Sequence, residues 1–175
     1  MCVFFGLELD SDTKRAVADW RDRYGLAHGQ PVPADNFHLT LAFVGEVDHR
    51  HLETLTQAVD QWASGYTVGA GRLVLDQAGY WQKQRIYWLG PEQPQLELAR
   101  LAVKLQNLAG PAGARRQRKL FVPHVTLFRS CAEPPPAPVV APRIDVHYQH
   151  FTLFETLQGR QGVSYRALQH WPLNR

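Results

Sequence analysis

Two copies of one short pattern constrain the fold of this chain more than any other feature. The pattern is a histidine, any residue, a threonine and an apolar residue, and the copies are His38-Leu39-Thr40-Leu41 and His124-Val125-Thr126-Leu127, 86 positions apart. Successive side chains of a β-strand face opposite ways, so each histidine shares a face with its threonine. Each copy therefore predicts a strand with one polar face and one buried face. In the first strand the expected buried face consists of Phe37, Leu39, Leu41 and Phe43.

A third copy of the pattern is His150-Phe151-Thr152-Leu153. Eight histidines and eight threonines in 175 residues would give roughly 0.4 such triplets by chance. Three copies are an excess, and one of them can still be accidental. The separation of His38 and His124, close to half the chain length, favours those two as the functional pair.

Composition places the chain among ordinary globular proteins. Its 175 residues fit one domain, or two closely packed half-sized lobes, and 45% are hydrophobic and 20% charged. The apolar runs are far shorter than the ~20 residues of a spanning helix, so no signal peptide or membrane anchor is expected. Cys2 and Cys131 are too few for a zinc knuckle or a disulfide scaffold. A reducing, cytoplasmic location is therefore expected.

The net charge of +3 is unevenly distributed. Residues 1–99 carry 8 Lys and Arg against 13 Asp and Glu, whereas residues 100–175 carry 11 against 3. The second half includes Arg115-Arg116-Gln117-Arg118-Lys119, with four cations in five positions. A basic half is typical of proteins that gather a polyanion, and it favours nucleic acid as partner. A basic run can equally be a solvated loop.

Hydrophobic periodicity predicts an α+β fold. Helices are expected over 12–24, 48–63 and 93–109, the first of them capped within Asp10-Ser11-Asp12. Strands are expected over 3–9, 37–44, 66–76, 84–89, 121–128, 144–155 and 162–170, and residues 131–143, with five prolines, form a loop. Several neighbouring strands lack a crossover helix, which excludes a doubly wound parallel sheet. Two related lobes with a central cleft fit this order.

The paired motif carries the chemistry of phosphodiester cleavage. Histidine has an ordinary pKa of about 6.5, so its acid and base forms are both accessible near neutrality. Opening a cyclic phosphate needs a base that takes a proton from water and an acid that protonates the departing ribose oxygen. Threonine hydroxyls can donate to the non-bridging oxygens, where charge accumulates. A single histidine on a strand is more often a structural residue, and the matched pair is what favours catalysis.

Other sequence features give weaker signals. His49-Arg50-His51 lacks a carboxylate–histidine framework for a metal and is expected to cap a helix in solvent. No phosphate-binding G-x-x-x-x-G-K-[ST] motif occurs in the sequence. Four aromatic side chains could stack on a base, although packing in the core is the more common role: Tyr80, Trp81, Tyr87 and Trp88.

The chain resembles the 2H phosphoesterases, and within them the bacterial RNA 2′,3′-cyclic phosphodiesterases first named 2′-5′ RNA ligases. The resemblance runs nearly end to end. It rests on Phe4-Phe5-Gly6-Leu7-Glu8-Leu9, the block Asp35–Glu46, Trp88-Leu89-Gly90, Pro123–Arg129 and Phe151-Thr152-Leu153-Phe154. It implies a two-lobed α+β fold in residues 1–175, a single domain of pseudo-symmetric lobes. Antiparallel sheets would face a central cleft, with the helices outside.

The resemblance also implies a reaction and residue roles. The reaction is hydrolysis of a 2′,3′-cyclic phosphate to a 2′-phosphate without metal or other cofactor. By position, His38 matches the proton donor, His124 the proton acceptor, and Thr40 and Thr126 the phosphate-binding threonines. His150 lies where the family requires no histidine. Arg129 matches an arginine that approaches the substrate, yet simple alternation places it opposite His124, so that only a bulge or a strand end would bring it round.

Two alternatives stay open at this point. The same site could join RNA ends through a 2′-5′ linkage, because one site can catalyse both directions of a reaction. A non-catalytic module that binds RNA or nucleotides is the other alternative, and its marker would be the loss of one histidine, whereas both are present. The expected partners are RNA ends or nucleotides that bear a 2′,3′-cyclic phosphate, with no membrane, and the protein is expected to be a monomer.

Overall fold

The computed structural model describes residues 1–65, 68–116 and 120–174. Its α-helices are α1 (Ser11–Tyr24), α2 (His49–Gly65) and α3 (Leu96–Leu108), and short 3₁₀ turns cover Ala34–Asn36 and Gly110–Ala112. Its strands are β1 (Cys2–Glu8), β2 (Gln30–Pro31), β3 (His38–Glu46), β4 (Gly71–Leu75), β5 (Gln77–Trp81), β6 (Ile86–Gly90), β7 (Val125–Arg129), β8 (Ile144–Tyr148), β9 (His150–Gly159) and β10 (Gly162–Pro172). None of the described helices has the length and apolarity needed to cross a membrane.

The helix ends follow from local sequence. Asp10 caps α1 by accepting a hydrogen bond from the backbone N–H of Thr13 at 2.7 Å, as its position predicts. Asp48 accepts from the N–H of His51 at the start of α2, and the ring of His51 bonds the same carboxylate at 2.7 Å. Asp48 is therefore the capping residue, and His49–His51, which were expected to cap a helix, form the first turn of α2 in solvent.

The strands form one long antiparallel path with a narrow point at its centre. The order is β10-β9-β1-β3-β7-β6-β5, with β2 added on β7, while β4 and β8 pair separately. β3 and β7 are joined by the single pair Leu39–Val125. We call β1, β3, β9 and β10 the first wing, and β2, β5, β6 and β7 the second wing. The two wings meet where the two His-x-Thr motifs lie.

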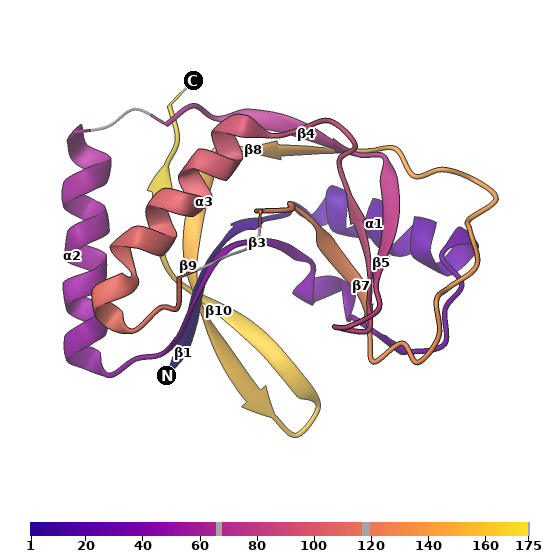
Figure 1. The fold of residues 1–175 in the computed structure, drawn as a ribbon, viewed down its shortest axis with the longest axis horizontal. Helices are drawn as coiled ribbons and strands as arrows, with labels where there is room; N and C mark the ends of the chain where they lie inside the picture. Colours follow the sequence, from indigo (N-terminus) through magenta and orange to yellow (C-terminus); the bar gives the residue numbers. More distant parts are fainter. Residues whose placement is uncertain (66–67, 117–119, 175) are drawn as a thin grey trace.

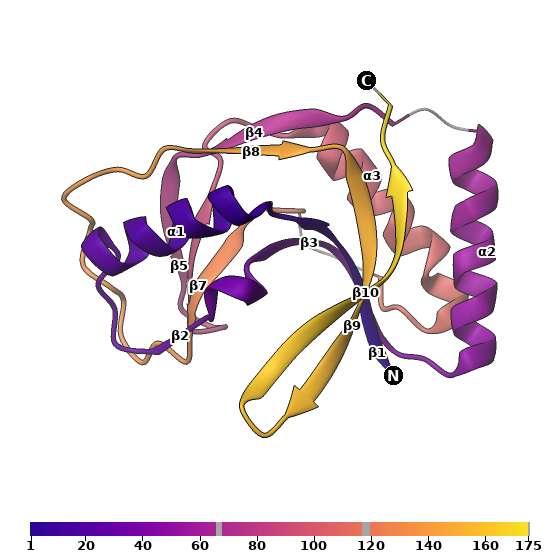
Figure 2. The ribbon, with the colours of Figure 1, turned by 180° about the vertical axis from the view of Figure 1, so that it is seen from behind.

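Helices α1 and α3 each pack on the wing that does not contain the strand preceding them in the chain. α1 follows β1 in sequence but packs on the second wing, where its Arg21 lies over the ring of Phe128. α3 precedes β7 but packs on β3, and α2 packs against α3 (Figure 1). Viewed from behind, α1 crosses β5 and β7, and the β4–β8 pair runs along the top of both wings (Figure 2). The helices therefore lie on the outside of the strands.

The structure confirms the α+β antiparallel fold and corrects parts of its element assignment. Of the strand expected over residues 66–76, only β4 is a strand, and residues 66–67 lie outside the described part. The strand expected over 144–155 is divided at Gln149 into β8 and β9. β5 was not expected from sequence. The residue at its centre is Gly79, where any larger residue would clash with the ring of Trp88 on the neighbouring strand. The glycine weakens the strand pattern in the sequence.

Candidate active site

The pair Leu39–Val125 brings the two motifs side by side, running in opposite directions. In an antiparallel pair, residues that lie opposite each other point to the same face. This register therefore places Thr126 beside His38 and Thr40 beside His124. The four polar side chains share one face of the sheet, whereas Leu39 and Val125 are fully buried on the other.

Both imidazoles are oriented by the same local hydrogen bond. Nδ1 of His38 lies 2.8 Å from the carbonyl oxygen of Asn36, and Nδ1 of His124 lies 2.9 Å from that of Val122. A carbonyl oxygen can only accept, so Nδ1 carries the proton in both rings. The other ring nitrogen, Nε2, takes no part in this bond, and in His38 it lies 2.9 Å from Oγ1 of Thr40. In the neutral rings, Nε2 of His38 thus accepts from the Thr40 hydroxyl, and Nε2 of His124 presents its lone pair.

Aromatic side chains enclose the two rings. The His38 ring lies 4.8 Å from Tyr165 and 5.0 Å from Phe4, centroid to centroid. The His124 ring lies edge-on to Trp81 at 4.5 Å, with Trp88 at 6.2 Å. Each imidazole is therefore packed against aromatic residues of its own wing. These contacts fix the rings and remove much of the water around them.

This enclosure lowers the pKa of both histidines. The pKa of His38 is lowered from 6.5 to about 4, first by burial and then by the charges of Arg129, His124 and Lys14, against the opposing effect of the hydrogen bond to the Asn36 carbonyl. The pKa of His124 is lowered as well, first by burial and then by Arg129. Both rings are therefore neutral near pH 7 in the free protein.

A bulge after each threonine changes which side chains reach this face. On β3, Thr40 pairs with Gly6 and Ala42 pairs with Phe5, so the residue between them, Leu41, is extra. On β7, Thr126 pairs with Trp88 and Phe128 with Tyr87, so Leu127 is extra in the same way. An extra residue shifts the alternation of the strand by one.

The bulges decide the positions of Phe43 and Arg129. Phe43 was expected in the core with Leu41, but it turns away from the core and is 52% exposed. Arg129 turns to the same face as His124, and its charge lowers the pKa of both histidines. Simple alternation is thus wrong for Arg129, and the bulge supplies the rotation that the sequence required.

Helices α1 and α3 each contribute one buried polar side chain that donates hydrogen bonds to the backbone at or just after a bulge. Arg21 of α1 donates from Nη1 to the carbonyl of Leu127 at 3.3 Å and also to that of Val32. Gln106 of α3 donates from Nε2 to the carbonyl of Phe43 at 3.3 Å. The Leu127 carbonyl also accepts from the backbone N–H of Val32 at 2.8 Å, so the side chain of Arg21 adds a second bond to it. The helices therefore contribute to the position of both motif strands.

A cleft of about 680 Å³ opens beside Thr40 and His124. Its lining is largely apolar, from Phe43, Trp81 and Val103, with polar groups from Gln84, Gln106, Asn107 and Arg116. Of the four aromatic residues considered from sequence, Trp81 lines the cleft, Tyr87 and Trp88 are buried, and the hydroxyl of Tyr80 donates to the Cys131 carbonyl. The cleft is large enough for a nucleoside.

The structure brings five of the residues named from sequence to one place: His38, Thr40, His124, Thr126 and Arg129. His150 lies apart from them, next to Glu8 and His170. Sequence reasoning missed Tyr165 and Lys14, since both come from elements whose position beside His38 depends on tertiary packing. Of the basic run 115–119, residues 117–119 lie outside the described part, and Arg116 borders the cleft.

Comparison with known proteins gives a consistent result. A family model described as LigT like Phosphoesterase matches residues 7–88. The RNA 2′,3′-cyclic phosphodiesterase of Escherichia coli strain K12 is 34% identical over 175 residues, which cover 98% of this chain and 96% of that protein. The protein of the same name from Thermotoga maritima is 27% identical over 181 residues, covering 96% and 93%.

A solved structure shares the whole fold. The crystal structure of E. coli LigT complexed with 3′-AMP has a TM-score of 0.88 and 32% sequence identity, covering 99% of this chain and 98% of that chain. The fold and the paired motif are those of the 2H phosphoesterases. Within that class, the chain belongs to the LigT-like phosphoesterase family.

Proposed function

We propose that this protein hydrolyses 2′,3′-cyclic phosphates, at RNA ends or on nucleotides, to 2′-phosphomonoesters. The observation that carries the proposal is the convergence of two oriented imidazoles, His38 and His124, on one face at the junction of the wings. The E. coli relative, 34% identical along the chain, bears the name RNA 2′,3′-cyclic phosphodiesterase. The proposed reaction uses no metal ion.

In the proposed mechanism, His124 is the base and His38 is the acid. Nε2 of neutral His124 takes a proton from a water molecule as its oxygen attacks phosphorus. The bond from phosphorus to the ribose 3′ oxygen breaks, and Nε2–H of His38 protonates that oxygen. The product carries a 2′-phosphate and a free 3′ hydroxyl, and proton exchange with solvent restores both rings.

Thr40, Thr126 and Arg129 stabilise the charge that develops on phosphate. The two hydroxyls flank the imidazoles on the same face and can donate to the non-bridging oxygens. Arg129 brings a permanent positive charge to the site, as its effect on both histidine pKa values indicates. The apolar cleft beside Thr40 and His124 would receive the nucleoside, with Trp81 and Phe43 against its base.

The low pKa of His38 has a consequence for this mechanism. With a pKa of about 4, His38 is neutral at pH 7 in the free protein and cannot act as an acid. An anionic phosphate bound between the rings favours the protonated form of His38. Substrate binding therefore takes up a proton, and binding of the product 2′-AMP does the same. Calorimetry of 2′-AMP binding in buffers of different ionisation enthalpy measures this uptake.

The test of the function uses purified, full-length protein with a chelator present. It is incubated with a 2′,3′-cyclic mononucleotide and, separately, with an RNA that ends in the same group. We expect a 2′-phosphate from both, and the ratio of the two rates identifies the preferred substrate. A 3′-phosphate product would contradict the proposed cleavage of the bond to the 3′ oxygen, and tight binding without product would indicate a binding module.

The reverse reaction is tested in the same experiment. An RNA with a free 5′ hydroxyl is added as acceptor, and a 2′-5′ joined product is sought beside the hydrolysis product. Water is present at a far higher concentration than any RNA end, so we expect hydrolysis to dominate. Predominant joining would favour the ligase alternative.

A further inference from the structure

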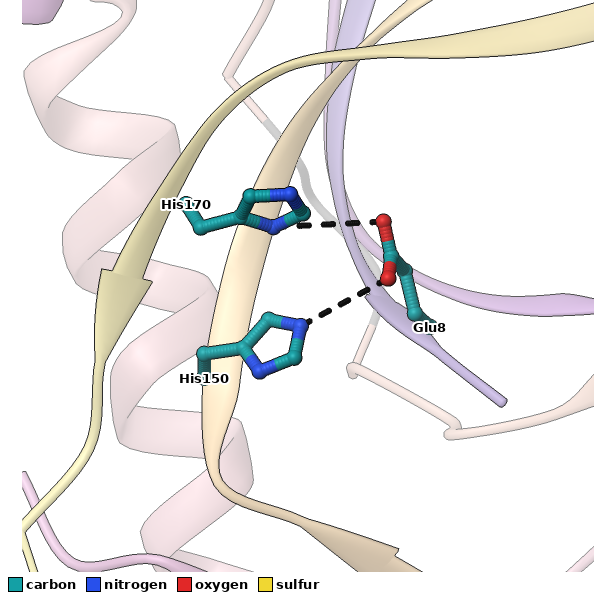
Figure 3. A group of neighbouring side chains, drawn as sticks. All are labelled: Glu8, His150 and His170. Carbon is teal, nitrogen blue, oxygen red and sulfur yellow. Dashed lines mark ion pairs between the residues drawn. The ribbon is translucent and has the colours of Figure 1, made fainter. Parts of the chain in front are cut away.

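The third His-x-Thr copy contributes to a separate polar cluster on the first wing. His150 begins β9, His170 lies near the end of β10, and Glu8 ends β1, so three adjacent strands each supply one side chain. The three side chains point toward one another (Figure 3). Within the described parts of the chain, these residues form a group whose possible ligand atoms all lie within 4.8 Å of one another.

The donor atoms of this cluster have spacings close to those of a metal site. Nε2 of His150 lies 3.6 Å from Oε2 of Glu8, and Nδ1 of His170 lies 3.9 Å from Oε1 of Glu8. In a tetrahedral zinc site with bonds of about 2.0–2.1 Å, neighbouring ligand atoms are roughly 3.4 Å apart. The two spacings to Glu8 exceed this value by only a few tenths of an ångström, and all the donor atoms lie within 4.8 Å of one another, so rotation of the side chains would bring them to ligating distances.

One of the donor atoms is buried without a hydrogen bond. Nε2 of His150 has no hydrogen-bond partner within the part of the chain that the structure describes. A buried polar atom without a hydrogen bond is unfavourable, and the few that native proteins retain often contact an ordered water or an ion, or have a functional role. This nitrogen points at the Glu8 carboxylate, and a cation between the two groups would bind both.

We propose that Glu8, His150 and His170 bind a divalent transition metal of the zinc class between β1, β9 and β10. Two imidazoles and one carboxylate are a common zinc ligand set, with a fourth position left for water. An anion is the poorer occupant, because the Glu8 carboxylate would face it. The site is accessible to a metal, since the side chains of Glu8, His150 and His170 are 37%, 40% and 50% exposed.

Binding of the metal would break one existing hydrogen bond. Nδ1 of His170 lies 2.9 Å from the hydroxyl of Thr152, the threonine of the third motif copy. The hydroxyl has to release this nitrogen when the metal binds. Replacement of Thr152 by Val removes the competing bond with little change of volume, so this variant is expected to bind the metal at least as tightly as the wild type.

The cluster lies on the same sheet face as the candidate active site but is distinct from it. Glu8 is the cross-strand neighbour of His38 in the register of β1 and β3. Since His38 and His124 are also two histidines, the experiment has to separate the two possible zinc sites. The variant His124→Ala removes one histidine of the candidate active site and leaves the cluster complete, which gives a matched comparison.

The test measures zinc binding to tag-free, full-length protein by competition with a chromophoric chelator. We expect one zinc ion per chain in the wild type, retained in His124→Ala and in the exposed control His147→Ala. Loss of an outer-shell partner already weakens metal binding ~10–100-fold, so His150→Ala, His170→Ala and Glu8→Gln should each weaken it at least as much. Circular dichroism of each variant confirms that it folds.

Thermal unfolding provides a second readout. Zinc should raise the melting temperature of the wild type and of His124→Ala but not that of His150→Ala, because only a folded-state site stabilises the protein. A wild type that takes up no zinc overturns the proposal. So does zinc binding that survives His150→Ala and His170→Ala, or that is lost in His124→Ala. None of these results bears on the hydrolysis assay, which is run with chelator.

Discussion

The two wings present the same motif with the same local geometry but in different surroundings. In both, Nδ1 of the histidine donates to the carbonyl two residues earlier, and a bulge follows the threonine. His38 is enclosed by Phe4 and Tyr165 and has Nε2 bonded to Thr40, whereas His124 borders an open cleft. The motif therefore fixes where each Nε2 points, and the wing fixes how readily the ring is protonated.

This comparison bears on the two different roles that we propose for one repeated pattern. The pKa of His38 falls to about 4, mainly because burial disfavours its charged form, with Arg129 and Lys14 acting in the same direction, as does His124 when it is protonated. The pKa of His124 is lowered by burial and by Arg129. An acid and a base require rings that respond differently to the bound phosphate, and the unequal surroundings provide that difference.

The largest expected effect comes from removing either imidazole. His38→Ala and His124→Ala should each lower kcat for a 2′,3′-cyclic nucleotide about 10²–10⁴-fold, because an acid or a base is missing from the same step. The double variant should be only slightly slower than either single variant. His147→Ala, an exposed histidine on β8, serves as control and should match the wild type. Multiplied losses in the double variant would show that the rings act in separate steps.

The threonines should have a smaller and more equal effect. Thr40→Val and Thr126→Val remove one hydroxyl donor each and keep the volume, so each should lower kcat about 10²-fold. The two losses are expected to agree within an order of magnitude if both wings hold the same phosphate. A large loss in one variant and none in the other would place the phosphate on a single wing.

Arg129 provides a test of pH dependence. The pKa of His38 is about 4 and that of His124 is below 6.5. In the free protein, the state in which only one of the two histidines is protonated is therefore populated mainly below pH 6.5. The profile of kcat/KM should therefore have its maximum there. Arg129→Gln removes a cation that lowers both pKa values, so the maximum should move to higher pH while KM rises about tenfold. An unchanged or lower optimum would mean that Arg129 does not face the rings.

The smallest effect tests the bulge of β3 through stability. Leu41 is buried, and Leu41→Ala should lower the free energy of unfolding by about 2–5 kcal/mol. Phe43→Ala should cost less than about 1 kcal/mol, because the ring is already half exposed. Urea unfolding of the two variants gives both values. A loss of about 3–5 kcal/mol in Phe43→Ala, typical of a core phenylalanine, would show that the strand alternates without a bulge.

The sequence predicts the parts of this site that depend on short-range patterns. The strands around His38 and His124 and the cap at Asp10 follow from alternation and residue type. The positions of Phe43 and Arg129 do not, since a bulge is defined by the partner strand, β1 or β6. The exchange of α1 and α3 between the wings also depends on packing of distant segments. The division of residues 1–175 into pseudo-symmetric lobes of one domain stays a prediction, which the matched bulges support.

The convergence of both wings on one phosphorus atom is tested most directly by a crystal structure with 2′-AMP. We expect Nε2 of His38, Nε2 of His124 and the hydroxyls of Thr40 and Thr126 all within hydrogen-bond distance of the same phosphate group. Arg129 should approach that group from the end of β7. A phosphate held by one histidine alone, with the other ring out of reach, would contradict the two-histidine mechanism.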